Sequence, residues 1–320
     1  MNKVPRKTPY LQMIDGAPRS PLLRPEVYRA ASKFTPTAND VILVTYPKSG
    51  THWLSQIVVL VLNKGRSPRG LQGLARQAPF IEYQGVAASN RSPRLLRTHL
   101  PFGQLQYDKH AKYIYVARNP WDTCVSFYHH VKQLLHYGFL GGTFEDFVEA
   151  FLKSKVGQPD HLDHVLSGYA RRDEPNVLFL TYEELRADTA GTVLKLARFL
   201  GKPYASMFDQ DSGLMDEVLF KSSVDYMRGT HEVNLEELSM IYNYSPISEE
   251  IEAEVKNIRN GTTRFCFVRK GTAGDWRSHF SPQLLEQMQA WINDKTRDSD
   301  VMSLWGNELT ANNLAQVARN

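Results

Sequence analysis

The 320-residue sequence has little cysteine and no long apolar run, and each absence excludes a class of protein. With only Cys124 and Cys266, the chain has no basis for a disulfide framework, which favours a reducing, cytoplasmic environment. Residues 1–10 carry charges without an apolar core behind them, unlike a signal peptide. The apolar run 57–62 is too short to span a membrane. We therefore expect a cytoplasmic protein with no membrane partner.

Linkers, repeats and strongly basic segments are missing as well. Because no Gly/Ser-rich or Pro-rich linker divides the chain, we expect a single domain over residues 1–320. The net charge is only +4, and no basic stripe of the kind that binds nucleic acid is present. The segment 160–164 has metal-ligand residue types at helical spacing, but no third cluster completes a metal site. Neither a nucleic-acid partner nor a metal is expected.

Strand candidates alternate with helical segments along the chain. The strands are expected at 41–45, 94–98, 112–117 and 176–181, and the helices at 120–136, 144–154, 162–171 and 192–200. This alternation predicts an α/β fold, a three-layer sandwich with a central parallel sheet. Ligands of such sheets bind at the carboxyl ends of the strands. Lys48, His99, Arg118 and Tyr182 each follow a predicted strand, so we expect them to converge.

The most informative segment is 45–53, which reads Thr-Tyr-Pro-Lys-Ser-Gly-Thr-His-Trp. It lies between the strand 41–45 and an apolar helix that starts near Trp53, and this strand-loop-helix arrangement offers backbone N–H groups and a helix N-terminus to a phosphate. In the common P-loop the lysine follows the last glycine, whereas here Lys48 precedes Gly50. The segment is therefore P-loop-like without being a P-loop.

This segment resembles the cofactor loop of the cytosolic sulfotransferases, which use 3′-phosphoadenosine-5′-phosphosulfate (PAPS). Residues 118–129 resemble the strand and helix that bind the 3′-phosphate in that family, and residues 269–276 resemble its R-K-G-x-x-G-D-W signature. The motifs follow the family order over roughly residues 10–280. The resemblance implies transfer of the sulfuryl group of PAPS to a hydroxyl of a small acceptor, with release of 3′-phosphoadenosine-5′-phosphate (PAP) and without a metal.

The resemblance also implies catalytic roles. His99 matches the catalytic base, and its ordinary pKa of about 6.5 suits proton removal from a hydroxyl. Lys48 would donate to the bridging oxygen of the leaving group, and Ser126 would restrain Lys48 by a hydrogen bond until the acceptor arrives. Arg97 stands where vertebrate members usually have a lysine that assists at the reacting centre; arginine keeps the charge but occupies more space.

The cofactor contacts implied by the resemblance fall into three groups. Backbone and side-chain groups of the loop would hold the 5′-phosphate, namely Lys48, Ser49, Gly50, Thr51, His52 and Trp53. The 3′-phosphate would be bound by Arg118, Ser126, Arg269, Lys270 and Gly271. The adenine would be contacted by Trp53, Tyr182, Ser222 and Val224, the last at a position where the family usually has phenylalanine.

The acceptor side is less well defined by sequence. Phe80 and Tyr83 lie in a segment that resembles the family's P-F-L-E-F wall, and Phe127 and His136 are further candidates. A phenol, a catecholamine or a related alcohol is expected, because a flat ring suits aromatic walls. His129 and His130 are expected near the mouth of the site.

The segment 229–263 is expected to form a flexible gate over the acceptor. Its glutamates suggest a preference for a hydroxyl acceptor that bears an amine, although a solvated helix face at 249–257 is the favoured explanation of them. The family's dimer motif is degraded here to Arg277, Ser281, Pro282 and Glu286. Because Pro282 lacks a backbone donor, we expect a monomer or a weak homodimer.

Two alternatives stay open at this point. The chain could be a non-catalytic protein that binds PAP or a hydrophobic ligand, which only turnover can exclude. It could also be a nucleotide-dependent kinase, although the Gly-Lys-Ser/Thr order is missing.

Overall fold

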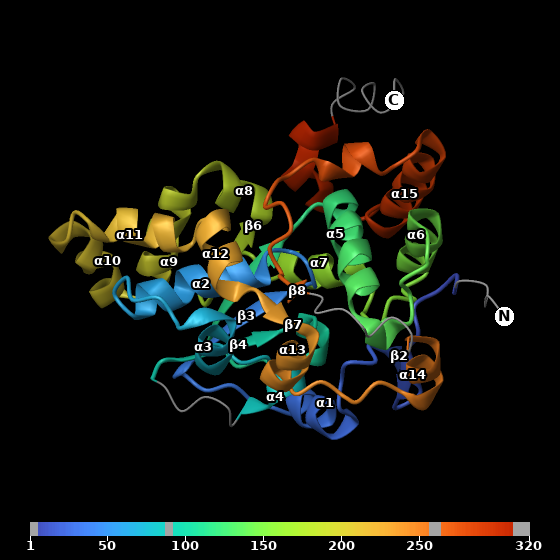
Figure 1. The fold of residues 1–320 in the computed structure, drawn as a ribbon. Coiled ribbons are helices and arrows are strands. Elements are labelled where there is room, and N and C mark those ends of the chain that lie inside the picture. The colour runs from blue at the N-terminus through green and yellow to red at the C-terminus, as the bar shows by residue number, and fades with distance from the viewer. Residues whose placement is uncertain (1–5, 87–91, 256–263, 310–320) are drawn as a thin grey trace.

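The computed structural model describes residues 6–86, 92–255 and 264–309 (Figure 1). A parallel four-stranded sheet in the order β4-β3-β5-β6 lies at its centre. Its strands are β3 (Asp40–Thr45), β4 (Arg94–Thr98), β5 (Lys112–Ala117) and β6 (Val177–Thr181). All residues of β3 are buried, as expected of a central parallel strand. The four strands predicted from the sequence are confirmed to within one residue.

Two hydrophobic cores lie on opposite faces of this sheet, so the fold has three layers. Alternate residues of a strand enter different cores: Val41 and Leu43 belong to one, and Ile42 and Val44 to the other. The first core includes α2 (Thr51–Leu62), α8 (Tyr182–Ala187), α9 (Thr189–Leu200), α10 (Lys202–Gln210) and α11 (Leu214–Lys221). The second includes α1 (Pro25–Ser32), α5 (Pro120–Gln133), α6 (Phe144–Leu152), α7 (His161–Tyr169), α13 (Leu235–Tyr242) and α15 (Pro282–Lys295). The predicted α/β sandwich is therefore confirmed.

Shorter elements complete the described chain. The remaining helices are α3 (Gly70–Gln77), α4 (Ile81–Gln84), α12 (Val224–His231) and α14 (Glu249–Val255), and the 3-10 turns are η2 (Phe102–Gln104), η3 (Leu135–Tyr137), η4 (Asp275–Ser278) and η5 (Val301–Leu309). Two antiparallel pairs lie outside the central sheet: β1 (Gln12–Ile14) with β2 (Ala17–Arg19), and β7 (Val233–Asn234) with β8 (Arg264–Phe265). No helix of the described residues is both long and apolar enough to cross a membrane.

Side-chain caps mark the starts of several helices. The Asn119 side chain accepts a hydrogen bond from the Asp122 backbone N–H (2.8 Å) and Pro120 occupies the first turn, as predicted for the start of α5. The predicted continuation of this helix to His136 is wrong, because the backbone of Leu134 is extended and a separate 3-10 turn follows. The helix α9 begins earlier than predicted because the Asp188 carboxylate caps it at the Gly191 N–H.

The predicted gate, residues 229–263, is described only in part, since 256–263 lie outside the described residues. Its described part contains the end of α12, the strand β7 and the helices α13 and α14. Leu238 and Tyr242 of α13 are buried in the core. This part of the segment therefore packs on the domain, and its role as a gate stays a prediction.

Candidate active site

A cavity of about 120 Å³ opens at the carboxyl ends of the central strands. Lys48, His99, Arg118 and Tyr182 all line it, each just after a different strand, as the sequence predicts. Its further lining comes from the expected residues Gly50, Thr51, His52, Trp53, Ser126, Ser222, Val224, Arg269, Lys270 and Gly271. Ser49 is buried beneath the loop and does not line the cavity. The structure thus brings almost all of the predicted cofactor residues together.

The loop between β3 and α2 is held in a conformation that needs glycine at its end. Gly50 precedes α2 at a φ of +99°, and a Cβ added there would lie 2.8 Å from the Tyr182 ring. The hydroxyls of Thr45 and Thr51 are 2.7 Å apart and join the end of the strand to the start of the helix. Because Gly50 has no side chain, the N-terminus of α2 stays accessible from the cavity.

Lys48 is a half-buried cation without an anionic partner among the described residues. Its ammonium lies 5.6 Å from the centre of the Phe267 ring. Burial, together with the nearby Arg118 and Arg269, lowers the pKa of Lys48 from 10.5 to about 7. A phosphate or sulfate placed here would reverse that shift, so the geometry of Lys48 fits an anionic ligand.

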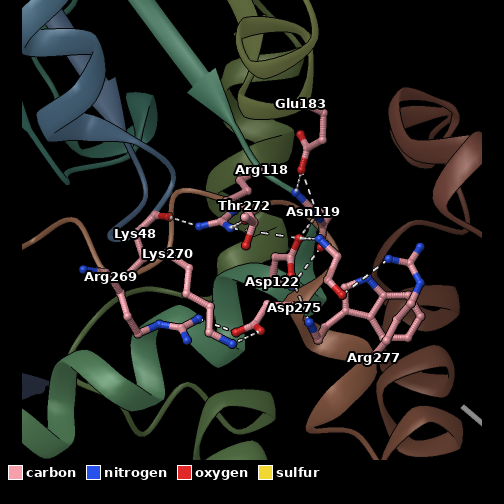
Figure 2. A network of polar contacts seen from close by, with 12 residues as sticks. Lys48, Arg118, Asn119, Asp122, Glu183, Arg269, Lys270, Thr272, Asp275 and Arg277 are labelled. Atoms are coloured by element: carbon pink, nitrogen blue, oxygen red, sulfur yellow. Dashed lines mark hydrogen bonds and ion pairs between the residues drawn. The ribbon is translucent and has the colours of Figure 1, made fainter. Parts of the chain in front are cut away.

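The second group of cations lies between α5 and the C-terminal signature (Figure 2). Arg118 donates to the carbonyl oxygens of Lys48 (3.0 Å) and Thr272 (3.2 Å). Arg269 and Lys270 both donate to the Asp275 carboxylate, each at 2.5 Å. Burial by itself raises the pKa of Asp275, but the hydrogen bonds from Lys270 and Arg269 outweigh burial and hold this pKa below its usual value. The Asp275 carboxylate thus pairs with two of the cations that line the cavity.

Asp122 explains why distant parts of the chain meet here. Its carboxylate accepts from the backbone N–H groups of Gly274 (2.7 Å) and Trp276 (3.1 Å). Because Asp122 lies in the first turn of α5, these bonds fix the C-terminal signature beside the helix that starts after Arg118. The sequence did not single out Asp122 for this role, although its place in the first turn is visible there.

The environment of His99 leaves one ring nitrogen for chemistry. The carbonyl oxygen of Thr45 lies 2.7 Å from Nδ1 and can only accept, so Nδ1 carries the proton and Nε2 the lone pair. The backbone N–H of His99 donates to the Glu82 carboxylate (2.6 Å). Burial lowers the pKa of His99 to about 3, and its hydrogen bond to Thr45 opposes that shift in part. A neutral imidazole with a free Nε2 therefore shares the cavity with Lys48.

Arg97 lies elsewhere. Its side chain is fully buried, its Nε donates to the Ala78 carbonyl, and its guanidinium lies 4.2 Å from the centre of the Phe80 ring. It does not line the cavity that contains Lys48 and His99. Its predicted assistance at the reacting centre gains no support from this position and stays a prediction.

The four predicted acceptor residues are not brought together. The Phe80 ring is 4.6 Å from the His99 ring, and Tyr83 lines a second, narrow cavity of about 10 Å³ that also reaches His99. Phe127 instead packs in the core against the Tyr46 ring. His136 donates through Nε2 to the carbonyl of Ser245, in the segment predicted as a gate. Only Phe80 and Tyr83 therefore lie beside His99.

The side chains of His52 and Ser126 differ from what the resemblance implies. The His52 ring stacks on Phe267 (3.7 Å between centres), and its Nε2 is 2.8 Å from the Tyr242 hydroxyl, so this imidazole points to α13. Its backbone N–H is the group that could still meet a 5′-phosphate. Ser126 lines the cavity but, among the described residues, forms no hydrogen bond with Lys48.

Some lining residues were missed by the sequence reasoning or assigned too loosely. Phe267 lies directly after the short strand β8, where no periodic pattern marks it. His130 also lines the cavity, and its spacing of four residues from Ser126 on α5 could have placed it on the same helix face. His129 does not line the cavity and lies 3.1 Å from His279, nitrogen to nitrogen.

Comparison with known proteins agrees with this geometry. A sulfotransferase domain model matches residues 38–300. The 3-alpha-hydroxysteroid sulfotransferase of Cavia porcellus is 33% identical over 280 residues, covering 85% of this chain and 88% of that protein. The amine sulfotransferase of Oryctolagus cuniculus is 31% identical over 288 residues, covering 87% and 88%. Mouse sulfotransferase SULT7A1 complexed with PAP superimposes with a TM-score of 0.67 at 25% identity, covering 97% and 99%. The chain therefore belongs to the sulfotransferase family and is a PAPS-dependent sulfotransferase.

Proposed function

We propose that this enzyme transfers the sulfuryl group of PAPS to a hydroxyl of a small acceptor, with His99 as the general base. The observation that carries this proposal is the meeting of His99 and Lys48 in one cavity. The hydrogen bond from Nδ1 to Thr45 leaves the Nε2 lone pair of His99 free to take a proton. Lys48 supplies a half-buried cation where the leaving oxygen would develop charge.

The residues present fit PAPS as the sulfuryl donor. The start of α2 with Gly50 would hold the 5′-phosphosulfate end, while Arg118, Ser126, Arg269, Lys270 and Gly271 would hold the 3′-phosphate. Two buried polar atoms of this cradle, Ser49 Oγ and Arg118 Nε, have no hydrogen-bond partner among the described residues. The Tyr182 ring lies 5.6 Å from the Trp53 ring, and with Ser222 and Val224 these rings would border the adenine.

The bonds and the proton of the proposed transfer are accounted for without a metal. His99 Nε2 takes the proton of the acceptor hydroxyl while its oxygen forms a bond to sulfur, and the bond between sulfur and the bridging oxygen breaks. Lys48 donates a hydrogen bond to that bridging oxygen as PAP departs. The negative charge of the bound donor would raise the pKa values of both groups from their values in the empty cavity.

The acceptor is proposed to be a phenol, a catecholamine or a related alcohol. The related enzymes are named for a hydroxysteroid and for an amine, so the family accommodates different acceptors. The glutamates of α14 keep an amine-bearing acceptor within this proposal, with dopamine expected to be a better acceptor than an uncharged phenol of similar size.

A monomer or a weak homodimer in the cytoplasm completes the proposal. The residues that replace the family's dimer motif are used within the fold, since Ser281 caps α15 and Pro282 occupies its first turn. Both cysteines are free thiols, which suits a reducing compartment.

Turnover of PAPS tests the proposal directly. The purified protein is assayed with phenol, dopamine and an aliphatic alcohol, with and without EDTA, beside the variants His99→Ala and Lys48→Met. We expect EDTA-resistant transfer that both variants abolish, while PAP binding by calorimetry survives in His99→Ala. The exposed His110 provides a matched control, His110→Ala, which should keep full activity. PAP binding without any turnover would indicate a non-catalytic binding protein, and magnesium-dependent use of ATP would indicate a kinase.

A further inference from the structure

His130 presents an unengaged imidazole to the reaction cavity. It lines the cavity, and among the described residues neither of its ring nitrogens has a hydrogen-bond partner. Its Nδ1 is buried, and the rings around it are those of Phe265 (5.8 Å between centres), Phe267 (5.9 Å) and Phe127 (6.1 Å). A polar ring in such apolar surroundings is costly unless a partner is supplied from the cavity.

The helix geometry places His130 beyond the cofactor contacts. Ser126 and His130 are four residues apart on α5 and both line the cavity, so they share one helix face. The helix starts next to Arg118, so His130 lies about 6 Å further along its axis from that start than Ser126 does. The Phe267 ring joins this position to the reacting centre, because the Lys48 ammonium lies 5.6 Å from that ring.

The electrostatic surroundings agree with this placement. Burial is the main cause that holds the pKa of His130 well below its ordinary value, and the neighbouring titratable groups Lys48 and His99 act in the same direction. His130 is therefore neutral near pH 7, with one N–H donor and one acceptor nitrogen. Of the three histidines that line the cavity, His52 and His99 each have a hydrogen-bond partner, whereas His130 has none among the described residues.

Resting on the proposed sulfuryl transfer, we propose that His130 is a specificity-determining residue. It selects acceptors that carry a second hydrogen-bonding group on the same ring as the reacting hydroxyl, as in ortho- and meta-dihydroxybenzenes. When His99 receives the reacting hydroxyl, the second group meets the His130 imidazole. A phenol without that group leaves the imidazole without a partner from the acceptor, and a site that hydrogen-bonds a substrate hydroxyl discriminates against an analogue that lacks it.

The test compares catechol, resorcinol and phenol as acceptors. The kcat/KM for each diol is divided by that for phenol in the wild type, in His130→Phe and in His130→Gln. The phenylalanine keeps a flat ring, and the glutamine keeps a hydrogen-bond donor and an acceptor. His110→Phe makes the same chemical change at an exposed site. PAP affinity by calorimetry reports whether each variant still forms the nucleotide site.

We expect the wild type and His110→Phe to prefer at least one diol over phenol by about tenfold, the worth of one net hydrogen bond. In His130→Phe the kcat/KM ratio, counted per hydroxyl, should fall to about one while PAP affinity is kept, and His130→Gln should retain part of the preference. An active enzyme whose ratio is the same in wild type and His130→Phe would overturn this inference alone. Failure of the wild type to sulfate any acceptor would overturn the proposed function and this inference with it.

Discussion

Binding of PAP should take up a proton, because Lys48 is poorly protonated in the empty cavity. With its pKa at about 7, Lys48 carries a proton in roughly one molecule in ten at pH 8. Phosphates placed against the ammonium favour its charged form and return the pKa toward its ordinary value of 10.5. The complex should therefore bind about 0.9 proton more than the free protein at pH 8, and about 0.1 more at pH 6.

The assay is calorimetry in buffers with different ionisation enthalpies, whose slope reports the proton uptake. Measurements at pH 8 avoid interference from PAP, because phosphate monoesters titrate near pH 6. Since the complex binds more protons than the free protein, the affinity should fall by up to about tenfold per pH unit above pH 7. His99 adds little at pH 8, because its pKa is about 3 in the free protein and a return to its ordinary value of 6.5 would still leave the imidazole neutral there.

Two variants separate Lys48 from other groups. Lys48→Met should bind PAP without proton uptake at pH 8. Lys48→Arg should also bind without uptake, since arginine stays charged, and its affinity should lose the pH dependence. Absence of uptake in the wild type, or uptake that persists in Lys48→Met, would refute the reasoning.

Three further predictions concern the groups around Lys48. Gly50→Ala should lower the free energy of unfolding, measured in urea, by about 1–3 kcal/mol and weaken PAP binding. The reason is that Gly50 has a φ of +99° and a Cβ would lie 2.8 Å from the Tyr182 ring. An unchanged unfolding curve would contradict this. Asp275→Asn should tighten PAP binding several-fold by releasing Arg269 and Lys270; weaker binding would show that Asp275 positions these cations instead. Burial raises the pKa of Glu82 to about 7 from 4.5, so its protonated form stabilises the fold below pH 4.5 and that contribution is lost as the pH rises through 7. Relative to Glu82→Gln, the wild type should thus lose roughly 3 kcal/mol of unfolding free energy across this range; parallel pH curves in urea titrations would argue against it.

Most of the fold was predictable because the central strands are buried on both faces. Residues 41–45 and 112–117 read as continuous apolar runs, and the groups that follow them, Lys48 and Arg118, must then lie at one edge of the sheet. Helix boundaries were less predictable, because Leu134 leaves the helical conformation inside an otherwise helical pattern.

The acceptor side was predicted less well because aromatic residue type does not specify direction. Phe127 was expected in the acceptor wall but faces the core, and its helix neighbours Ser126 and His130 face the cavity instead. The face of α5 that lines the cavity could have been derived from Ser126. The position of Phe267 could not, because it depends on the pairing of the two-residue strand β8 with β7.

In the free protein the cations around the cavity stay close together by three different means. The pKa of Lys48 is lowered to about 7, Arg118 donates to the carbonyl oxygens of Lys48 and Thr272, and Arg269 and Lys270 share the Asp275 carboxylate. Each arrangement lowers the repulsion between like charges without an added anion, and each can be reversed by a phosphate. Binding of a nucleotide with phosphates at both ends should therefore draw on protonation and partner exchange as well as on new contacts. For this reason, the new contacts in the complex would by themselves overstate the affinity. Proton uptake at Lys48 is the part of this replacement of interactions that calorimetry can measure separately.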